Sequence, residues 1–163
     1  MLDKEPMTQK GFEKIAAELE SLKNAERAKV AREIQTAAQL GDLKENAEYH
    51  AAKEKMNHLE KRVTLLEGLI ARAQVVDPSI LPHKRVSFGS TVTLLDLETE
   101  NEVSYTIVGS VESDAQKGLI SFGSPLARAL IGKEEGADVI ADLPNGIKEF
   151  EIVKIAYDAK AFI

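Results

Sequence analysis

Residues 41–48 read Gly-Asp-Leu-Lys-Glu-Asn-Ala-Glu, and they interrupt a pattern that is helical on both sides. This segment, the tip, carries three acidic residues, Asp42, Glu45 and Glu48. A turn that only connects two helices does not need three carboxylates. We therefore expect the tip to be the working end of the molecule.

The chain after the tip has the apolar spacing of a coiled-coil seam. Its apolar positions recur three and four residues apart, at Tyr49, Ala52, Met56, Leu59, Val63, Leu66, Ile70 and Ala73. Apolar residues at this spacing line one face of a helix and pack against a partner helix. The sequence predicts a long amphipathic helix directly after the tip.

The chain before the tip predicts a second helix over about residues 9–39, with Thr8 as N-cap and Gly41 as a left-handed C′ residue. Its apolar row comprises Phe12, Ile15, Leu19 and Leu22, and then, on a shifted row, Val30, Ile34 and Ala37. Glu26 stands where an apolar residue is due, so we expect the seam to be interrupted there. Because the connection is only about five residues long, the helices must fold back antiparallel. The prediction is a helical hairpin with the acidic tip at its far end.

Composition is that of a globular protein with one or two domains: 163 residues, of which 44% are hydrophobic. The sequence has no cysteine, which excludes a disulfide framework and a thiolate zinc site. No stretch approaches the roughly 20 apolar residues of a membrane span, and the first residues lack the order of a signal peptide. We expect a cytoplasmic protein that does not contact a membrane.

Charge argues against direct binding of nucleic acid. The net charge of −6 divides into −1 for residues 1–80 and −5 for residues 81–163. A protein that binds phosphates through its own surface normally has a basic stripe. The basic residues of the first helix are instead mixed with acids, as Lys23, Arg27, Lys29 and Arg32 are with Glu20, Glu26 and Glu33. This mixture is typical of a solvated face, so a protein partner is expected.

Two prolines, Pro78 and Pro82, end the helical pattern. We place a linker at residues 77–84, between a hairpin domain of residues 1–76 and a second domain of residues 85–163. Strand patterns follow at Val86–Leu95, Glu102–Val108, Leu119–Ser121, Asp138–Ala141 and Glu149–Ile155. One helix interrupts them, with Ser124 as N-cap, Pro125 at N1 and a stop at Gly132. The predicted fold class is α+β: a helical hairpin followed by a small antiparallel sheet covered by one short helix.

Asp42 and Glu45 admit two interpretations. Asp-x-x-Glu at the start of a helix is a capping box, in which each side chain satisfies a backbone N–H of the first turn. Alternatively, both carboxylates are ligands for a hard cation such as Mg²⁺, which often takes only one or two carboxylates, with water and substrate phosphates. Glu48 adds charge that a cap does not require, and only Lys44 lies near enough to offset it. An exposed turn has too few ligands to hold a metal alone, so the expected metal site is shared with another protein.

The histidines His50, His58 and His83 predict no site. His50 and Glu54 are four residues apart and could in principle hold a metal ion together. Such a pair on an exposed helix is usually solvated, so we assign it no role.

The chain resembles the bacterial Gre family of transcript cleavage factors, and its GreA branch more closely than its GreB branch. The resemblance covers nearly the whole chain and rests on four stretches: Pro6-Met7-Thr8 with Gly11, the tip with Tyr49, Ile107-Val108-Gly109, and Ile120-Ser121 followed by residues 124–133. The tip and the segment that begins at Ser124 are specific signals. Together they argue strongly against coincidence.

The resemblance implies a mode of action. In that family the C-terminal domain, similar in fold to FKBP-type isomerases, sits at the rim of the RNA polymerase secondary channel, and the hairpin reaches the active centre. When the polymerase has backtracked, the tip acids help to hold Mg²⁺ and position a water, and the polymerase cleaves the 3′ end of its own nascent RNA. We therefore expect a factor that is not itself an enzyme, binds no cofactor alone, and acts as a monomer on bacterial RNA polymerase.

Carried over to this sequence, the resemblance makes Asp42 and Glu45 the functional acids, which share Mg²⁺ only within the polymerase complex. Ser124 and Pro125 fall where the family docks on the polymerase, and Gly123 stands where some relatives have an acidic residue or Asn. Residues 37–39, Ala-Ala-Gln, precede the tip and imply weak contact with the extruded RNA. Short cleavage products, as in the GreA branch, are expected.

Two other functions stay open. A peptidyl-prolyl isomerase is conceivable from the domain fold, but it needs an aromatic-lined pocket, and fold alone is a poor warrant for activity. The C-terminal half has no Trp; its aromatic residues are Phe88, Tyr105, Phe122, Phe150, Tyr157 and Phe162. The other alternative is a secondary-channel binder that inhibits polymerase, as some Gre homologues and the zinc-finger protein DksA do. The lack of cysteine excludes a DksA-type zinc site, and the presence of both Asp42 and Glu45 favours cleavage.

Overall fold

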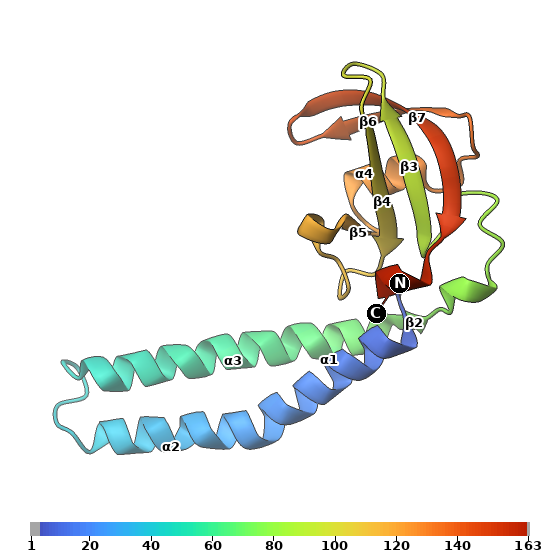
Figure 1. The fold of residues 1–163 in the computed structure, drawn as a ribbon. Coiled ribbons are helices and arrows are strands. Elements are labelled where there is room, and N and C mark those ends of the chain that lie inside the picture. Colours follow the sequence, from blue (N-terminus) through green and yellow to red (C-terminus); the bar gives the residue numbers. More distant parts are fainter. Residues whose placement is uncertain (1–3, 163) are drawn as a thin grey trace. The chain divides into compact units, whose positions relative to one another are not determined.

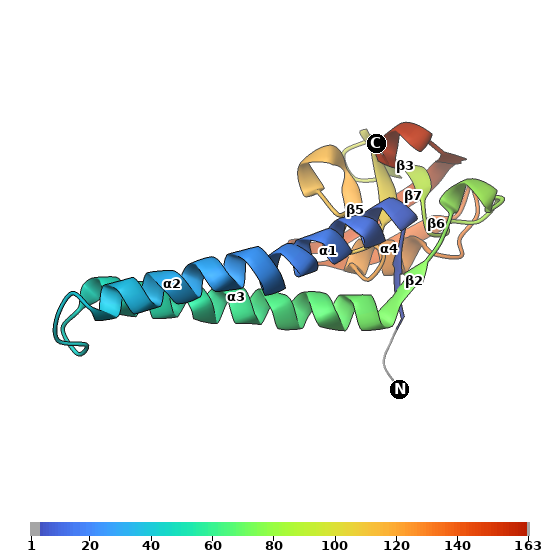
Figure 2. The ribbon, with the colours of Figure 1, turned by 90° about the horizontal axis from the view of Figure 1, so that it is seen from below.

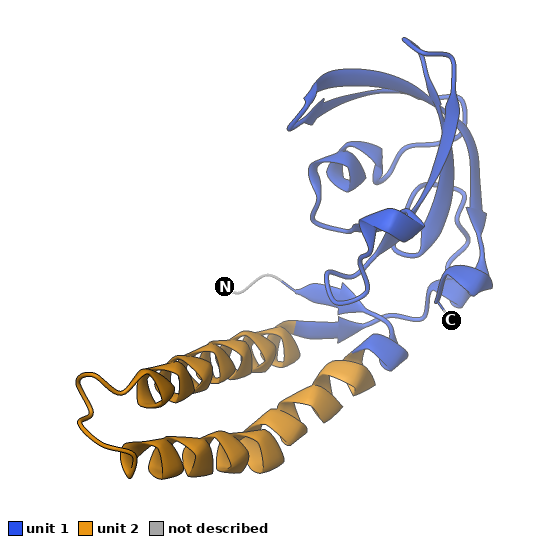
Figure 3. Ribbon diagram, turned by 60° about the vertical axis from the view of Figure 1, so that its left-hand side comes forward, with its two compact units in different colours: residues 1–11, 73–163 blue, residues 12–72 orange. Residues whose placement is uncertain are grey.

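The computed structural model describes residues 4–162, which form two compact units. The first unit comprises Met1–Gly11 together with Ala73–Ile163, and the second, the hairpin unit, comprises Phe12–Arg72 (Figure 3). The start of the chain thus groups with the C-terminal part, whereas the sequence pattern placed residues 1–76 together. No helix among the described residues has the length and apolar character needed to cross a membrane.

The hairpin unit has two helical arms. The first arm consists of α1 (Gln9–Ser21), a π-helical turn (Leu22–Glu26) and α2 (Arg27–Ala38), and the second arm is α3 (Ala47–Arg72). The first turn of α1, up to Gly11, belongs to the first unit. Figures 1 and 2 both show α2 running beside α3, and the tip is the loop that connects their ends. The predicted antiparallel hairpin is confirmed. Thr8 is confirmed as the N-cap, because its Oγ1 accepts a 3.1 Å hydrogen bond from the backbone N–H of Gly11.

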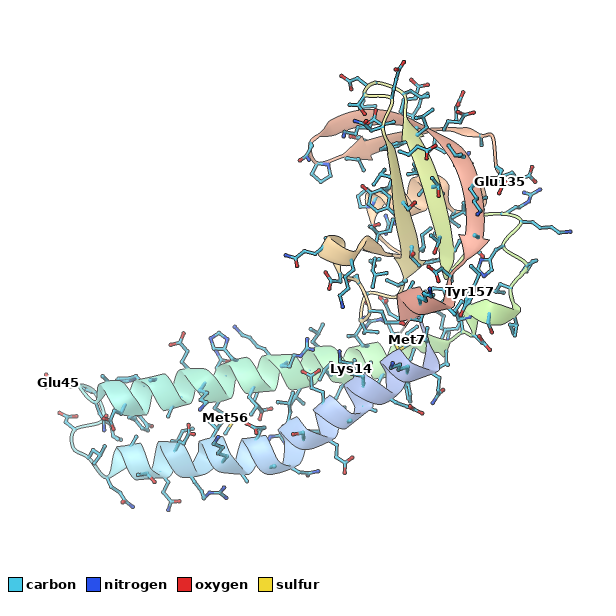
Figure 4. All side chains as sticks on the ribbon, viewed as in Figure 1. Met7, Lys14, Glu45, Met56, Glu135 and Tyr157 are labelled. Atoms are coloured by element: carbon cyan, nitrogen blue, oxygen red, sulfur yellow. The ribbon has the colours of Figure 1, made fainter. Side chains whose placement is uncertain are left out.

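The predicted seam forms the contact between the arms. Val30, Leu59 and Val63 are buried and form its centre, and partly buried side chains surround them: Leu19, Leu22, Ile34 and Met56. Figure 4 labels Met56 in the middle of the hairpin. Helix α3 ends at Arg72. The last residue of the predicted seam, Ala73, already belongs to a strand.

The interruption expected at Glu26 is the π-helical turn over Leu22–Glu26. A regular heptad would place the next equivalent apolar residue seven positions after Leu22, whereas Val30 lies eight positions after it. A π turn closes i→i+5 hydrogen bonds and so takes up one additional residue. Leu22 and Val30 therefore contact the same cluster against α3.

The first unit is built on a five-stranded sheet of order β5-β4-β3-β7-β6. Its strands are β3 (Ser90–Asp96), β4 (Glu102–Val108), β5 (Leu119–Ser121), β6 (Asp138–Leu143) and β7 (Gly146–Tyr157). The predicted β4 and β5 agree to the residue. The strand predicted from Val86 begins only at Ser90, since the chain turns at Gly89, where φ is +86° and an added Cβ would collide with the Cβ of Pro78.

One strand pair departs from the predicted antiparallel arrangement. β4 and β5 pair in parallel, with Thr106 opposite Leu119, so the sheet is mixed. Parallel neighbours cannot be joined by a tight hairpin. Residues 109–118 make the return, through a 3₁₀ turn at Ala115–Lys117 that ends at Gly118 in the left-handed conformation (φ 73°).

The helix α4 (Pro125–Leu130) completes this unit. Ser124 caps it as predicted, with its Oγ accepting from the backbone N–H of Ala127 at 3.3 Å. The buried core combines Leu126, Ala127 and Leu130 of α4 with apolar residues of the sheet: Val92, Leu94, Ile107, Val139, Ala141, Phe150, Ile152 and Ile155. The α+β fold class is confirmed.

A second, two-stranded sheet belongs to the same unit. β1 (Glu5–Met7) and β2 (Ala73–Val75) pair in parallel, and the backbone N–H of Val76 donates to the carbonyl of Met7 at 2.8 Å. The sequence pattern did not predict either strand. Both are only three residues long, and their partners are far apart in the chain, so local periodicity carries no signal for them.

The predicted linker is held by His83, which is buried. Its Nε2 lies 2.6 Å from the carbonyl oxygen of Pro78, and its Nδ1 lies 2.7 Å from Oγ of Ser90. A carbonyl only accepts, so Nε2 carries a hydrogen and donates it to Pro78, while Nδ1 and the hydroxyl of Ser90 share the second hydrogen bond. His83 thus has a structural role that its sequence position did not indicate.

Candidate functional site: the acidic tip

The tip presents exposed carboxylates at the end of the hairpin. Asp42, Glu45 and Glu48 are all exposed, and Figure 4 labels Glu45 at the turn between α2 and α3. The three acids line an open hollow of about 420 Å³ together with Leu40, Gly41, Asn46 and Ala47. The structure therefore brings the acidic residues of the tip together in one place, whereas the predicted docking residues Ser124 and Pro125 lie in the first unit.

The capping-box interpretation of Asp42 and Glu45 is wrong. The helix α3 begins at Ala47, and its cap is Asn46, whose Oδ1 accepts from the backbone N–H of Tyr49 at 3.0 Å. Asp42 accepts instead from the backbone N–H of Lys44 at 3.0 Å, which closes a local turn. Glu45 precedes the cap and cannot occupy the third helical position that a capping box requires. Within residues 4–162, the carboxylate of Glu45 forms no hydrogen bond or ion pair that would give it a structural role.

Gly41 does not serve as the predicted C′ residue. The helix α2 ends at Ala38 with Gln39 as its C-cap, so Gly41 lies two residues beyond the cap. Its φ of +144° is nevertheless one that glycine adopts far more easily than other residues. The glycine serves the turn of the tip rather than the end of the helix.

Asn46 was not recognised from the sequence as a tip residue of consequence. Its Nδ2 donates to the carbonyl oxygen of Ala37 at 2.6 Å, while its Oδ1 caps α3. An Asn directly before an apolar helical pattern is a capping signal and could have been read as one. The bond to Ala37 has no such local signal, because it joins residues nine positions apart.

His50, to which the sequence assigned no role, also contacts the tip. Its Nε2 lies 2.9 Å from the carbonyl oxygen of Lys44. A carbonyl only accepts, so Nε2 of His50 is the donor in this hydrogen bond. The hydrogen bond joins the first turn of α3 to Lys44, which directly precedes Glu45 and lies two residues after Asp42.

The donor set of the tip suits a hard cation only as part of a larger site. Within residues 4–162, no group of three or more His, Asp and Glu side chains is arranged to hold a metal ion. Asp42 and Glu45 supply two exposed carboxylates that form no ion pair within the described chain. Carboxylate oxygens are ligands that Mg²⁺ accepts, but the remaining ligands must come from elsewhere.

The predicted docking residues lie in the first unit, at the start of α4. Ser124 caps the helix, whereas Pro125 and Gly123 are exposed. A Cβ added at Gly123 would meet nothing within 4 Å, so a side chain fits there. Docking through Ser124 and Pro125 stays a prediction.

Known proteins are similar to this chain over nearly its whole length. The family model described as the N-terminal part of transcription elongation factors matches residues 5–75, and the model for the C-terminal part of GreA/GreB transcription elongation factors matches residues 81–157. The chain is 56% identical over 161 residues to transcription elongation factor GreA of Helicobacter pylori strain Shi470, covering 99% of this chain and 98% of the relative. It is 58% identical over 157 residues to the GreA factor of a Nitratiruptor species, covering 96% of each.

Two solved structures are also similar to the chain. One is the GreA factor homolog 1 (Gfh1) of Thermus thermophilus, which is 25% identical with a TM-score of 0.44 and covers 94% of this chain and 99% of the other. The second is a GreA/GreB elongation factor from Nitrosomonas europaea, which is 28% identical with a TM-score of 0.42. The match covers 66% of this chain and 93% of the other.

Proposed function

This chain belongs to the GreA/GreB family of transcription elongation factors, and we propose that it stimulates RNA polymerase to cleave the 3′ end of its own nascent RNA in backtracked complexes. Cleavage returns a paired 3′ end to the polymerase active centre, so that elongation resumes. The observation that carries the proposal is the pair of exposed acids Asp42 and Glu45 at the end of a helical hairpin, neither of which caps a helix.

The two units divide the work in this proposal. The first unit docks at the rim of the secondary channel through the segment at Ser124 and Pro125, and the hairpin delivers the tip into the channel. Tethering by the docked unit raises the effective concentration of the tip at the active centre. The factor acts as a monomer in the cytoplasm, where the polymerase works.

The chemistry at the tip is electrostatic. The carboxylates of Asp42 and Glu45 would supply two oxygen ligands to a Mg²⁺ site of the polymerase, and the ion bound there would supply Lewis-acid stabilisation of the phosphodiester. The same carboxylates orient the attacking water toward the phosphorus. Because both acids leave with the hairpin, the polymerase site returns to synthesis afterwards. The factor is not an enzyme by itself, and its contact with RNA is limited to the nascent 3′ end within the complex.

A variant without the two charges tests this function. Asp42→Asn/Glu45→Gln keeps the acceptor for Lys44 and leaves the Asn46 cap intact, so folding and polymerase binding should be unchanged. Stimulated cleavage in stalled elongation complexes should fall by about 10²-fold or more, the scale for losing a positioned electrostatic group. Raised Mg²⁺ should restore part of the activity, because the missing carboxylates act through metal affinity.

The matched control is Glu20→Gln/Glu54→Gln, which removes two exposed carboxylates elsewhere in the hairpin and should stimulate cleavage by the polymerase as the parent does. Free RNA incubated with the parent protein alone should stay intact. Normal stimulation by the Asp42→Asn/Glu45→Gln variant would refute the assignment of the tip acids. A parent that binds polymerase and only inhibits it would favour the inhibitory alternative.

A further inference from the structure

A single side chain joins the two helices on either side of the tip. Asn46 donates from Nδ2 to the carbonyl of Ala37 in the last turn of α2, at 2.6 Å, and accepts through Oδ1 from Tyr49 in the first turn of α3, at 3.0 Å. Helix ends leave carbonyl and N–H groups without intrahelical partners. The carbonyl of Ala37 also accepts from the backbone N–H of Leu40 at 3.1 Å. One amide therefore contacts both helix ends at once, on the two sides of the loop of residues 39–45.

A second contact orients the loop between the acids. His50 donates from Nε2 to the carbonyl of Lys44 at 2.9 Å, and the N–H of Lys44 donates to Asp42 at 3.0 Å. The peptide groups on both sides of Lys44 are thus held, one by the helix α3 and the other by Asp42 itself. Glu45 directly follows the carbonyl that His50 holds, and Asp42 accepts from the N–H of the same Lys44. The orientation of both carboxylates therefore depends on how Lys44 is held.

We propose that Asn46 and His50 are positioning residues that hold Asp42 and Glu45 in the geometry needed for transcript cleavage; this inference rests on the proposed function. Neither residue needs to touch the RNA or a metal ion. Their contribution is to order an exposed loop before it meets the polymerase, because a displacement of about 1 Å at reacting groups can cost about 10²-fold in rate. A cap alone would require only the Oδ1 of Asn46 and not its Nδ2.

The variant Asn46→Ser separates capping from positioning. Ser is as good an N-cap as Asn, so α3 keeps its cap, but its hydroxyl is too short to reach the carbonyl of Ala37 as well. The maximal rate of stimulated cleavage should fall about tenfold. This is less than the roughly 10²-fold loss in rate for a full displacement of about 1 Å, because the His50 contact remains. The concentration of factor that gives half the maximal rate should stay the same, because docking is untouched. The control Asn57→Ser, on an exposed position of α3, should match the parent.

His50 offers a conservative rescue. His50→Gln keeps an N–H donor that can reach the carbonyl of Lys44, whereas His50→Leu has a similar size and no donor. His50→Leu should lower the maximal cleavage rate several-fold, and His50→Gln should retain most of it. Equal rates for the two variants, or an Asn46→Ser variant that differs from the parent only in melting temperature, would overturn the positioning role. A raised half-saturating concentration with a normal maximal rate would overturn it too.

Amide hydrogen exchange in the free full-length protein reports on the loop without any polymerase. The N–H of Lys44 should exchange faster in Asn46→Ser and His50→Leu than in the parent, because the loop that holds it is looser. Unchanged exchange in both variants would overturn the proposal even if cleavage fell. A parent protein that stimulates no cleavage would refute the proposed function and, with it, the catalytic purpose of the two contacts. The exchange result would then still decide whether they order the loop.

Discussion

The hydroxyl of Thr8 donates a 2.7 Å hydrogen bond to the carboxylate of Glu112, a residue 104 positions later in the chain. The backbone N–H of Thr8 also donates to this carboxylate, at 3.1 Å. Thr8 at the same time accepts from Gly11 as the N-cap of α1. Glu112 therefore places a negative charge at the positive end of the helix and attaches the start of α1 to the loop between β4 and β5 of the same unit.

Removing this attachment should destabilise the protein without changing the tip. We expect Thr8→Val to lower the free energy of unfolding by about 1–2 kcal/mol, because it removes the cap and leaves the carboxylate of Glu112 without its hydroxyl donor. Urea denaturation followed by circular dichroism measures the loss. Thr36→Val makes the same change at an exposed position of α2 and should stay within about 0.5 kcal/mol of the parent. Equal stability of the two variants would contradict the role of Glu112.

The π-helical turn predicts that one particular deletion is tolerated. Deleting Ala25, an exposed residue of the turn, should convert it to regular α-helix and keep Leu22 and Val30 on the same seam, now seven positions apart. Its melting temperature should stay within a few degrees of the parent. Deleting the exposed Ala31 instead should rotate Ile34 and Ala37 away from α3 and cause a large loss of stability. Equal losses for the two deletions would show that the π turn does not absorb the extra residue.

Docking at the start of α4 predicts effects on apparent affinity rather than on the cleavage step. Pro125→Ala should raise the factor concentration for half-maximal cleavage about fivefold and leave the maximal rate unchanged. A fivefold loss of affinity is typical when an interface residue of moderate importance is truncated. Gly123→Asp fits the open space at this position and should lower the half-maximal concentration. Titrations of the factor against stalled complexes give both values. Asn145→Asp adds the same charge in the exposed turn between β6 and β7 and should have no effect. A lower maximal rate in Pro125→Ala with an unchanged half-maximal concentration would argue against docking there.

Asp96 predicts a pH-dependent contribution to stability. The backbone N–H of Glu98 donates to its Oδ1 at 2.9 Å, the N–H of Thr99 donates at 3.3 Å, and Nζ of Lys148 lies 3.6 Å away. These groups favour the charged carboxylate and hold its pKa below the ordinary value, with the bond from Glu98 the largest cause. The stabilisation is thus present above the unfolded pKa of about 3.9 and is lost as the pH falls through the folded value.

The variant Asp96→Asn isolates this effect, because Asn can still accept both N–H bonds but carries no charge. The parent should be the more stable protein at pH 7, and the difference should shrink as the pH falls below about 4. Urea denaturation across this pH range checks the expectation. Asp138→Asn, at an exposed position of β6, serves as control. A stability difference between parent and Asp96→Asn that is the same at pH 7 and pH 3 would contradict the assignment.

The sequence alone determined the elements whose signals are local. The three-and-four spacing from Tyr49 to Ile70 predicts α3, and Ser124 with Pro125 predicts the start of α4, because a helix face and a helix cap depend on residues within a few positions of one another. The misplaced Glu26 predicts an interruption, and the structure has the π turn there. The acidic tip was predicted from a local signal too, because residues 41–48 interrupt the helical spacing of apolar residues.

Only the tertiary structure decided which distant groups meet. The parallel pairing of β4 with β5, the pairing of β1 with β2, and the bond from Thr8 to Glu112 all join segments whose contact depends on the packed core and not on any local pattern. The same holds for Asn46, whose sequence position indicates a cap but not a bond to Ala37. Periodicity specifies which face of an element is buried, whereas the partner of each polar group is set by where the fold brings the chain back.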